Sequence, residues 1–297
     1  MPIKRLLTRF QKIVPVVDGA EVDLTDCEIT EPLYYGSTRA VSKGIVKSTG
    51  KTLALKHLSP RAGRSAEVRK NCLSSLKREE TFGQIMDHPN VVRIYGMADH
   101  EDESYLLMEF LGDGSLSDVI RKREDYSYRQ LINICYEVTK GLNYLHRQKI
   151  IHRDLKPSNV LFDGSRPVIT DFGFSYTEEI RGLRKVPPRS GTPKYMSPEQ
   201  TRGWEPTPAS DIFSFGIIMY ELFSGEMRIS AQDASNRAEK VITSHFRQLN
   251  ELNPRVPDDL STVVMQCLHN SRRSRIGHGL ELMRSLEPLL ERDYKQI

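Results

Sequence analysis

The chain has 297 residues, of which 38% are hydrophobic and 28% charged. This length and composition are those of a folded protein with one large or two smaller cores, not of a disordered chain. The net charge is +4, and residues 1–17 alone carry four cations and no acid, so the remainder is near neutral, which argues against nucleic-acid binding.

The cysteines and the hydropathy pattern indicate the compartment. Four cysteines lie far apart without a CxxC pair (Cys27, Cys72, Cys135 and Cys267), which argues against a disulfide framework or a cysteine metal site. We find neither an apolar run of membrane-spanning length nor the apolar core of a secretory signal. These features predict a cytoplasmic protein.

Residues 3–14 have the pattern of a basic amphipathic helix. Apolar residues repeat at helical spacing (Ile3, Leu6, Leu7, Phe10, Ile13 and Val14), while Arg5, Arg9 and Lys12 lie elsewhere. The helix could dock on the folded domain, bind a membrane surface weakly, or act as a short transit peptide. Residues 18–30 are predicted to be a linker.

Residues 31–110 are predicted to be rich in strands, with one helix. Leu53–Lys56 is a short apolar strand that ends in lysine, and residues 105–110 form a second buried strand. A helix is expected from about residue 67 to residue 86, before Pro89 bars its continuation.

Residues 111–297 are predicted to be mainly helical. Apolar residues at helical spacing predict a long buried helix over residues 128–148 (Leu131, Ile134, Cys135, Val138, Leu142 and Leu145). A second apolar helix is expected from about Asp211 to Phe223.

Between these helices lie polar residues suited to phosphate and metal chemistry. His152-Arg153-Asp154-Leu155-Lys156 is followed by Asn159 and by Asp171-Phe172-Gly173. Phosphoryl transfer needs a carboxylate to accept a proton, oxygen ligands for Mg²⁺, and cations against the developing charge. The HRDLKxxN and DFG strings supply these groups at the spacing of the protein-kinase template.

The chain therefore resembles the eukaryotic protein kinases, with matching motifs from about Leu33 to Arg275. The resemblance implies an α+β, bilobal fold: a small antiparallel sheet with one main helix, and a larger helical lobe. We expect residues 1–27 to be the basic helix and linker, 28–110 the N-lobe and 111–297 the C-lobe. Lys156 and Thr192 match the Ser/Thr type, and the whole is similar to the tyrosine-kinase-like group, in particular a family expanded in fungi.

The resemblance implies a role for each matching residue. Asp154 would be the base and Lys156 would neutralise the γ-phosphate, while Lys56 would pair with Glu79 or, as the alternative, Glu80. Asn159 and Asp171 would ligate Mg²⁺. The ATP-binding residues would be Gly36, Val41, Ala54, Lys56, Met108, Glu109, Leu111 and Leu161, with ATP and Mg²⁺ as cofactors and protein Ser/Thr residues as substrates.

The activation segment is the expected regulatory region. Arg153, directly before Asp154, would respond to a phosphate on this segment, and Thr192 is a further regulatory residue, while Pro188 occupies the usual phosphorylated position. The phosphate acceptors that remain are Ser175, Thr177 and Ser190, beside a basic cluster (Arg181, Arg184, Lys185 and Arg189). An upstream kinase or activating partner is implied. By resemblance, Asp211 would hold the catalytic-loop backbone, and Arg275 would pair with Glu199.

Two departures from the family pattern bear on activity. The glycine-rich loop keeps only Gly36, with Tyr34 and Arg39 at the outer glycine positions, which should weaken its phosphate-binding cradle. Gly83 stands where an apolar residue is expected to pack toward Phe172, which predicts a packing gap and a loosely held helix. A kinase is the first hypothesis, and a pseudokinase scaffold remains the alternative.

Overall fold

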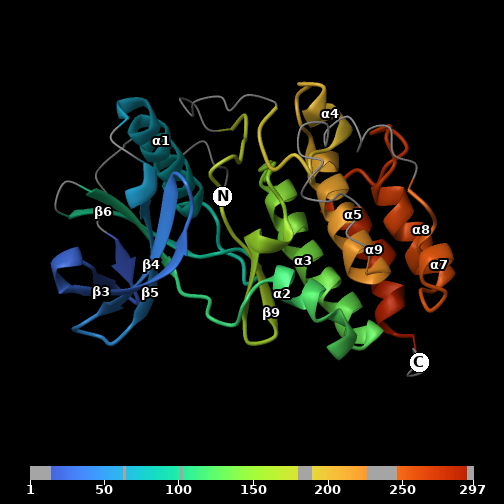
Figure 1. Cartoon of the computed structure of the whole chain (residues 1–297), viewed down its shortest axis with the longest axis horizontal. Helices are drawn as coiled ribbons and strands as arrows, with labels where there is room; N and C mark the ends of the chain where they lie inside the picture. The colour runs from blue at the N-terminus through green and yellow to red at the C-terminus, as the bar shows by residue number, and fades with distance from the viewer. Residues whose placement is uncertain (1–14, 63–64, 101–102, 180–188, 226–245, 293–297) are drawn as a thin grey trace. The chain divides into compact units, whose positions relative to one another are not determined.

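A computed structural model of the chain describes residues 15–62, 65–100, 103–179, 189–225 and 246–292 (Figure 1). The predicted helix over residues 3–14 lies outside these ranges, as do Arg181, Arg184, Lys185 and Pro188. The described chain divides into two compact units after Gly112. Unit 1 also contains the segment Asp171–Gly173, and unit 2 contains Asp113–Thr170 and Phe174–Thr177.

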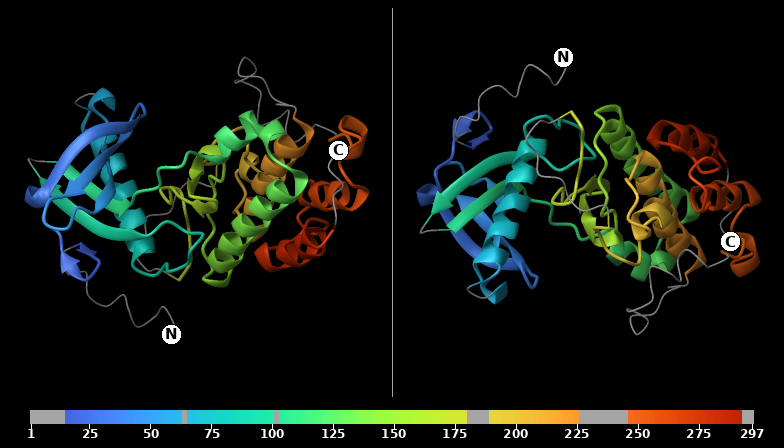
Figure 2. Two further views of the ribbon diagram at one scale, coloured as in Figure 1. Left: turned by 90° about the horizontal axis from the view of Figure 1, so that it is seen from below. Right: turned by 90° about the horizontal axis from the view of Figure 1, so that it is seen from above.

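Unit 1 is built on a five-stranded antiparallel sheet in the order β3-β4-β5-β7-β6. The strands are β3 (Cys27–Tyr35), β4 (Arg39–Val46), β5 (Thr52–Leu58), β6 (Ile94–His100) and β7 (Glu103–Glu109). Helix α1 (Ala66–Gly83) packs on the sheet against β5, β6 and β7 (Figure 2). The predicted strands and helix of this part are confirmed.

The predicted linker over residues 18–30 is wrong. The structure has a short hairpin there, β1 (Val16–Val17) with β2 (Ala20–Glu21), then a 3-10 turn at Leu24–Asp26 and the start of β3. Buried Val17, Val22 and Leu24 form one cluster with strand residues such as Leu53 and Leu55. The apolar residues were too few and too irregularly spaced to predict a strand, but tertiary contacts bury them.

Strand β5 is covered on both faces, which explains its continuous apolar sequence. Leu53 and Leu55 face the hairpin cluster, and because side chains alternate along a strand, Ala54 and Lys56 point to the opposite face. The register places Ala54 beside Met108 and Lys56 beside Val41. The sheet therefore brings one buried lysine to the face opposite the hairpin cluster.

Gly83 leaves no packing gap, contrary to the sequence-based expectation. A Cβ built at Gly83 would lie 2.4 Å from Ile94 Cβ and 2.8 Å from Ile94 Cγ2. Ile94 of β6 thus occupies the space of the missing side chain. The contact with Phe172 that was expected of an apolar residue at this position comes from the preceding residue, since the buried ring of Phe82 lies 6.4 Å from the Phe172 ring.

We expect Gly83→Ala to destabilise the protein by about 1–3 kcal/mol, because overpacking a filled site costs more than the helix gains from replacing glycine. Chemical denaturation would measure the change. Ser74→Ala, on the exposed face of the same helix, is the matched control and should have little effect. A more stable Gly83→Ala variant would contradict the close contact with Ile94.

Unit 2 is mostly helical. Its longer helices are α3 (Tyr128–Arg147), α5 (Pro208–Ser224), α8 (Asp258–Cys267) and α9 (Gly279–Leu290), joined by shorter α2 (Leu116–Arg121), α4 (Pro198–Thr201) and α7 (Leu249–Leu252). Helix α3 packs on α5 and α9 and on the hairpin of β8 (Val160–Asp163) and β9 (Arg166–Ile169). The predicted helices over 128–148 and 211–223 are confirmed, and with them the mixed α+β class.

Helix α3 shows how the sequence specifies this unit. Ser127 caps its first turn reciprocally with Gln130, and all six residues of its predicted apolar face are buried. Helix α5 is instead buried along nearly its whole length, which agrees with apolar residues on all sides of the helix. No helix in the described ranges is both long and apolar enough to cross a membrane.

Candidate active site

A buried charge cluster in unit 1 is centred on Lys56. Lys56 Nζ donates to both carboxylate oxygens of Glu79, at 2.7 and 2.8 Å, and to Asp171 Oδ1 at 2.8 Å. The side chains of Lys56 and Glu79 are 8% and 0% exposed. The sequence-based choice of Glu79 over Glu80 is confirmed, because Glu80 instead accepts a hydrogen bond from the backbone N–H of Met97.

The electrostatics of this cluster follow from burial and pairing. Burial lowers the pKa of Lys56, but the carboxylates of Asp171 and Glu79 outweigh it and hold that pKa above its ordinary value. Burial also raises the pKa of Glu79, in part offset by Lys56. The ammonium is therefore fixed as a cation between two carboxylates.

Asp171 has an unusual backbone conformation. Its φ is +65°, in the left-handed region that costs a non-glycine residue about 1 kcal/mol or more. The next residue, Phe172, is fully buried. At Gly173 a Cβ would lie 2.4 Å from Ser75 Oγ and 2.6 Å from an Arg39 Nη atom, so a larger residue there would have to displace these side chains.

The loop of unit 2 that contains Asp154 is held by hydrogen bonds to its backbone. The Asp211 carboxylate accepts from the backbone N–H groups of His152 and Arg153, both at 2.8 Å, and from His146 Nε2 at 3.1 Å. Burial alone would raise the pKa of Asp211, but these donors lower it overall. The structure thus places Asp211 on the catalytic-loop backbone, as predicted.

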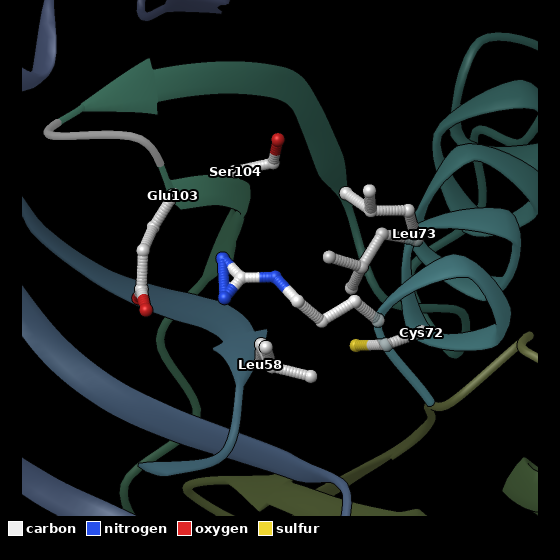
Figure 3. Close-up of a pocket in the computed structure, with 7 residues that line it drawn as sticks. Leu58, Cys72, Leu73, Glu103 and Ser104 are labelled. Atoms are coloured by element: carbon white, nitrogen blue, oxygen red, sulfur yellow. The ribbon is translucent and has the colours of Figure 1, made fainter. Parts of the chain in front are cut away.

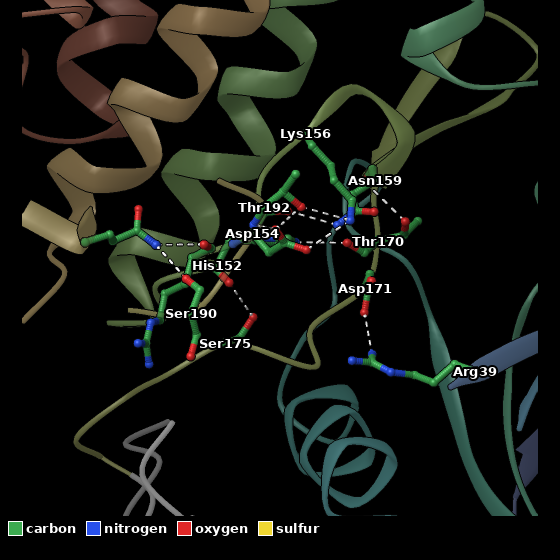
Figure 4. A network of polar contacts seen from close by, with 12 residues as sticks. Arg39, His152, Asp154, Lys156, Asn159, Thr170, Asp171, Ser175, Ser190 and Thr192 are labelled. Carbon is green, nitrogen blue, oxygen red and sulfur yellow. Dashed lines mark hydrogen bonds and ion pairs between the residues drawn. The ribbon is translucent and has the colours of Figure 1, made fainter. Parts of the chain in front are cut away.

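The Asp154 carboxylate is almost fully buried and oriented on both oxygens (Figure 4). Its Oδ1 accepts from the backbone N–H and the hydroxyl of Thr192, at 2.6 and 2.7 Å. Its Oδ2 accepts from Lys156 Nζ at 3.2 Å, and the same ammonium lies 3.2 Å from Thr192 Oγ1. Thr192, 38 residues away in the sequence, thus forms one cluster with Asp154 and Lys156.

Asn159 lies beside this cluster with its amide oriented. Its Nδ2 donates to the backbone carbonyl of Asp154 at 2.9 Å, which leaves the amide oxygen as the acceptor atom of the side chain. Asn159 and Asp171 therefore both offer oxygen atoms. Carboxylate and carbonyl oxygens are the ligands that Mg²⁺ takes in proteins, so the two residues fit this metal in their chemistry.

The predicted ATP-binding residues lie on the strands and the chain that follows them. Val41, Ala54 and Met108 lie on β4, β5 and β7, and Leu161 lies on β8 of unit 2. The Glu109 N–H donates to the Arg93 carbonyl. Gly36 lies in the turn after β3, and Leu111 is the second residue after β7. A cavity of about 50 Å³ elsewhere in unit 1, between α1 and the strands, contains none of these residues (Figure 3).

Two of the expected phosphate acceptors are excluded by burial. Ser175 is 0% and Thr177 2% exposed, and Ser175 Oγ donates to the His152 carbonyl. Ser190 is only half-buried, and its carbonyl accepts from Gln200 Nε2, which also donates to the Arg153 carbonyl. Sequence reasoning missed Gln200, since an uncharged residue directly after Glu199 gave no signal.

Glu199 and Arg275 form the predicted pair, with nitrogen–oxygen distances of 2.8 and 3.1 Å. Burial alone would raise the pKa of Glu199, but the guanidinium lowers it overall. The unfolded chain therefore binds a proton more tightly than the folded protein, and stability falls as pH drops below about 4.5 toward that lowered pKa.

We expect Glu199→Gln to flatten this acid dependence, although the variant itself is less stable. Urea unfolding between pH 3 and pH 6 would measure both slopes. Glu205→Gln, a carboxylate in the exposed loop after α4, is the control. Parallel slopes for wild type and Glu199→Gln would contradict the assignment.

Comparison with known proteins identifies the family. A family model described as protein kinase domain matches residues 28–287. The chain belongs to the protein kinase family. That family uses ATP and Mg²⁺ and acts on proteins.

The chain is similar to several curated kinases. One is the probable serine/threonine-protein kinase PknB of Lactococcus lactis, with 32% identity over 71% of this chain and 34% of that protein. The serine/threonine-protein kinase PrkC of Bacillus subtilis is 29% identical over 64% of this chain and 30% of that protein. Calcium-dependent protein kinase 5 of Plasmodium falciparum is 32% identical over 82% of this chain and 42% of that protein. The chain thus spans between 30% and 42% of the length of these relatives.

Proposed function

We propose that this chain is a protein serine/threonine kinase, which transfers the γ-phosphate of ATP to hydroxyl groups of protein Ser and Thr residues. The observation that carries the proposal is the Asp154 carboxylate, held by Lys156 and Thr192. A carboxylate of fixed orientation beside a cation is what proton acceptance from a hydroxyl next to phosphate requires.

The other residues take supporting roles in this proposal. Lys56, fixed by Glu79, binds phosphate oxygens, and Lys156 neutralises charge on the transferred phosphoryl group. Asn159 and Asp171 hold Mg²⁺, which when bound offsets the charge of the phosphates. The adenine and ribose pocket is formed by apolar and backbone groups (Gly36, Val41, Ala54, Met108, Glu109, Leu111 and Leu161). Because the Glu109 N–H is already bonded to Arg93, we assign its carbonyl to adenine.

The preference for Ser and Thr over Tyr is supported by the contact between Lys156 and Thr192 on the same carboxylate. The names of the similar kinases agree with this preference. The finer placement in the tyrosine-kinase-like group, near a family expanded in fungi, rests on the sequence strings alone.

Regulation through the activation segment is part of the proposal. Ser190 is the proposed phosphate acceptor, with an upstream kinase or an activating partner as its agent, and Arg153 and Thr192 as the residues that respond. We also propose a cytoplasmic location, which the four free, buried cysteines support. Residues 28–110 and 111–297 are the proposed lobes, preceded by a basic segment that could contact membranes weakly.

The pseudokinase alternative rested on Gly83 and the reduced glycine-rich loop. Its first argument is lost because Ile94 fills the space at Gly83, and the Lys56–Glu79 pair is formed. An assay of γ-phosphate transfer from labelled ATP to a generic basic protein tests the proposal. Phosphoserine and phosphothreonine are the expected products, and absence of transfer or phosphotyrosine alone would contradict it.

A further inference from the structure

Arg39 occupies a position in unit 1 where the family pattern has a glycine. The residue begins β4, and one of its Nη atoms lies 3.3 Å from Asp171 Oδ1 (Figure 4). The same Nη atom lies 3.6 Å from Glu79 Oε1. The Arg39 side chain is 20% exposed. It therefore reaches the same carboxylate oxygen that Lys56 Nζ contacts at 2.8 Å.

The described side chains of this cluster include equal numbers of cations and carboxylates. Two cations, Lys56 and Arg39, face two carboxylates, Glu79 and Asp171, at distances of 2.7 to 3.6 Å. A divalent cation that binds Asp171 would place further positive charge next to Arg39 in a partly buried site. Like charges at such distances repel strongly where water is limited.

Space gives the same result as charge. Mg²⁺ binds oxygen at about 2.0–2.1 Å in a near-ideal octahedron and keeps several of its waters. A guanidinium nitrogen lies 3.3 Å from Asp171 Oδ1, so a hydrated metal that binds this oxygen competes with Arg39 for the space beside it. Lys56, which also contacts this oxygen, is not expected to move like Arg39, because Glu79 holds its ammonium through two further hydrogen bonds.

We propose that Arg39 is a positioning residue that acts through Asp171: its guanidinium is the counter-ion of that carboxylate until Mg²⁺ replaces it. The pair with Arg39 competes with the bond to metal, so Arg39 raises the Mg²⁺ concentration that the site needs. The glycine of the family pattern has no side chain that could do this. The inference rests on the proposed binding of nucleotide and Mg²⁺ at this site.

The test measures binding rather than activity. ADP carrying a methylanthraniloyl fluorophore is bound to the metal-stripped full chain, and MgCl₂ is titrated in. We expect Arg39→Gln to lower the free Mg²⁺ at half-saturation by about five- to tenfold, in line with the loss of one partly exposed charge-assisted hydrogen bond. Arg39→Gly, which removes the side chain altogether, should give the same shift.

The matched control is Lys43→Gln. Lys43 lies on the same strand as Arg39, and its ammonium pairs with the exposed Glu31. This variant should leave the Mg²⁺ midpoint unchanged. Thermal unfolding in EDTA checks that every variant is folded. Because Arg39 is partly exposed, we expect both variants to fold, and a result from either one is enough for the test.

The outcomes separate the two proposals. If wild type binds the nucleotide but neither Arg39 variant lowers the midpoint, the counter-ion role is overturned. A midpoint that rises would also overturn it, since Arg39 would then assist phosphate or metal binding. If the wild-type chain binds no nucleotide with or without Mg²⁺, the proposed nucleotide function itself fails.

Discussion

Replacing Asp154 by Asn should lower kcat for phosphotransfer by about 10²–10⁴-fold, the usual contribution of a general base. Asn has the same shape and keeps an oxygen acceptor for Thr192, but it has no charge with which to take a proton. Its amide would also turn an N–H group toward Lys156 Nζ, where Asp154 Oδ2 now accepts a hydrogen bond. Nucleotide binding should be nearly unchanged.

The measurement is initial-rate kinetics with a basic protein substrate, together with fluorescent ADP binding. Asp163→Asn on β8 is the matched control, since Asp163 is exposed and pairs only locally with Arg166. An Asp154→Asn variant within threefold of wild-type kcat would show that Asp154 is not the base. A parallel loss of nucleotide binding would instead indicate a disrupted loop.

Replacing Glu79 by Gln is expected to destabilise the protein by about 3 kcal/mol and to reduce kcat. Removal of one partner from a buried pair leaves an uncompensated charge, which costs about 3–5 kcal/mol. We expect the lower end because Asp171 still faces Lys56 at 2.8 Å. Lys56 would then be drawn toward Asp171, and its position for phosphate would be lost.

Glu80→Gln is the control, on the same helix and one residue away. Glu80 accepts from the Met97 N–H at 3.2 Å, and a glutamine side-chain oxygen can accept the same bond. Chemical denaturation measures the stability of the Glu79→Gln and Glu80→Gln variants, and initial-rate kinetics measures their kcat. Equal losses of stability and activity at the two positions would contradict the assignment of Glu79 as the partner of Lys56.

Charge-bearing residues were predictable because their chemistry restricts where they can be. Asp154, Asn159 and Asp171 were named from short strings whose residue types and spacing are those of phosphoryl transfer. The Glu199–Arg275 pair and the Asp211 contacts followed from the same resemblance. A buried charge must find a partner, so a motif that contains one also predicts a contact.

Packing was not predictable in the same way. Whether a glycine leaves a gap depends on what packs against it, and at Gly83 this is Ile94, a residue of another element. The hairpin at Val16–Glu21 likewise has too few residues for a periodic pattern. From the sequence, Ser175 and Thr177 were expected to accept phosphate, but both side chains are buried in the folded protein.

By itself, the sequence determined the family, the main helices and strands, and the identity of the ionisable groups, because periodicity and charge are properties of local sequence. Only the tertiary structure decided that Arg39 lies on Asp171 and Glu79. It also decided that Thr192 donates to Asp154. These contacts join residues 38 and 132 positions apart in the sequence. A local sequence pattern cannot predict them, because the two side chains come close only when the chain has folded.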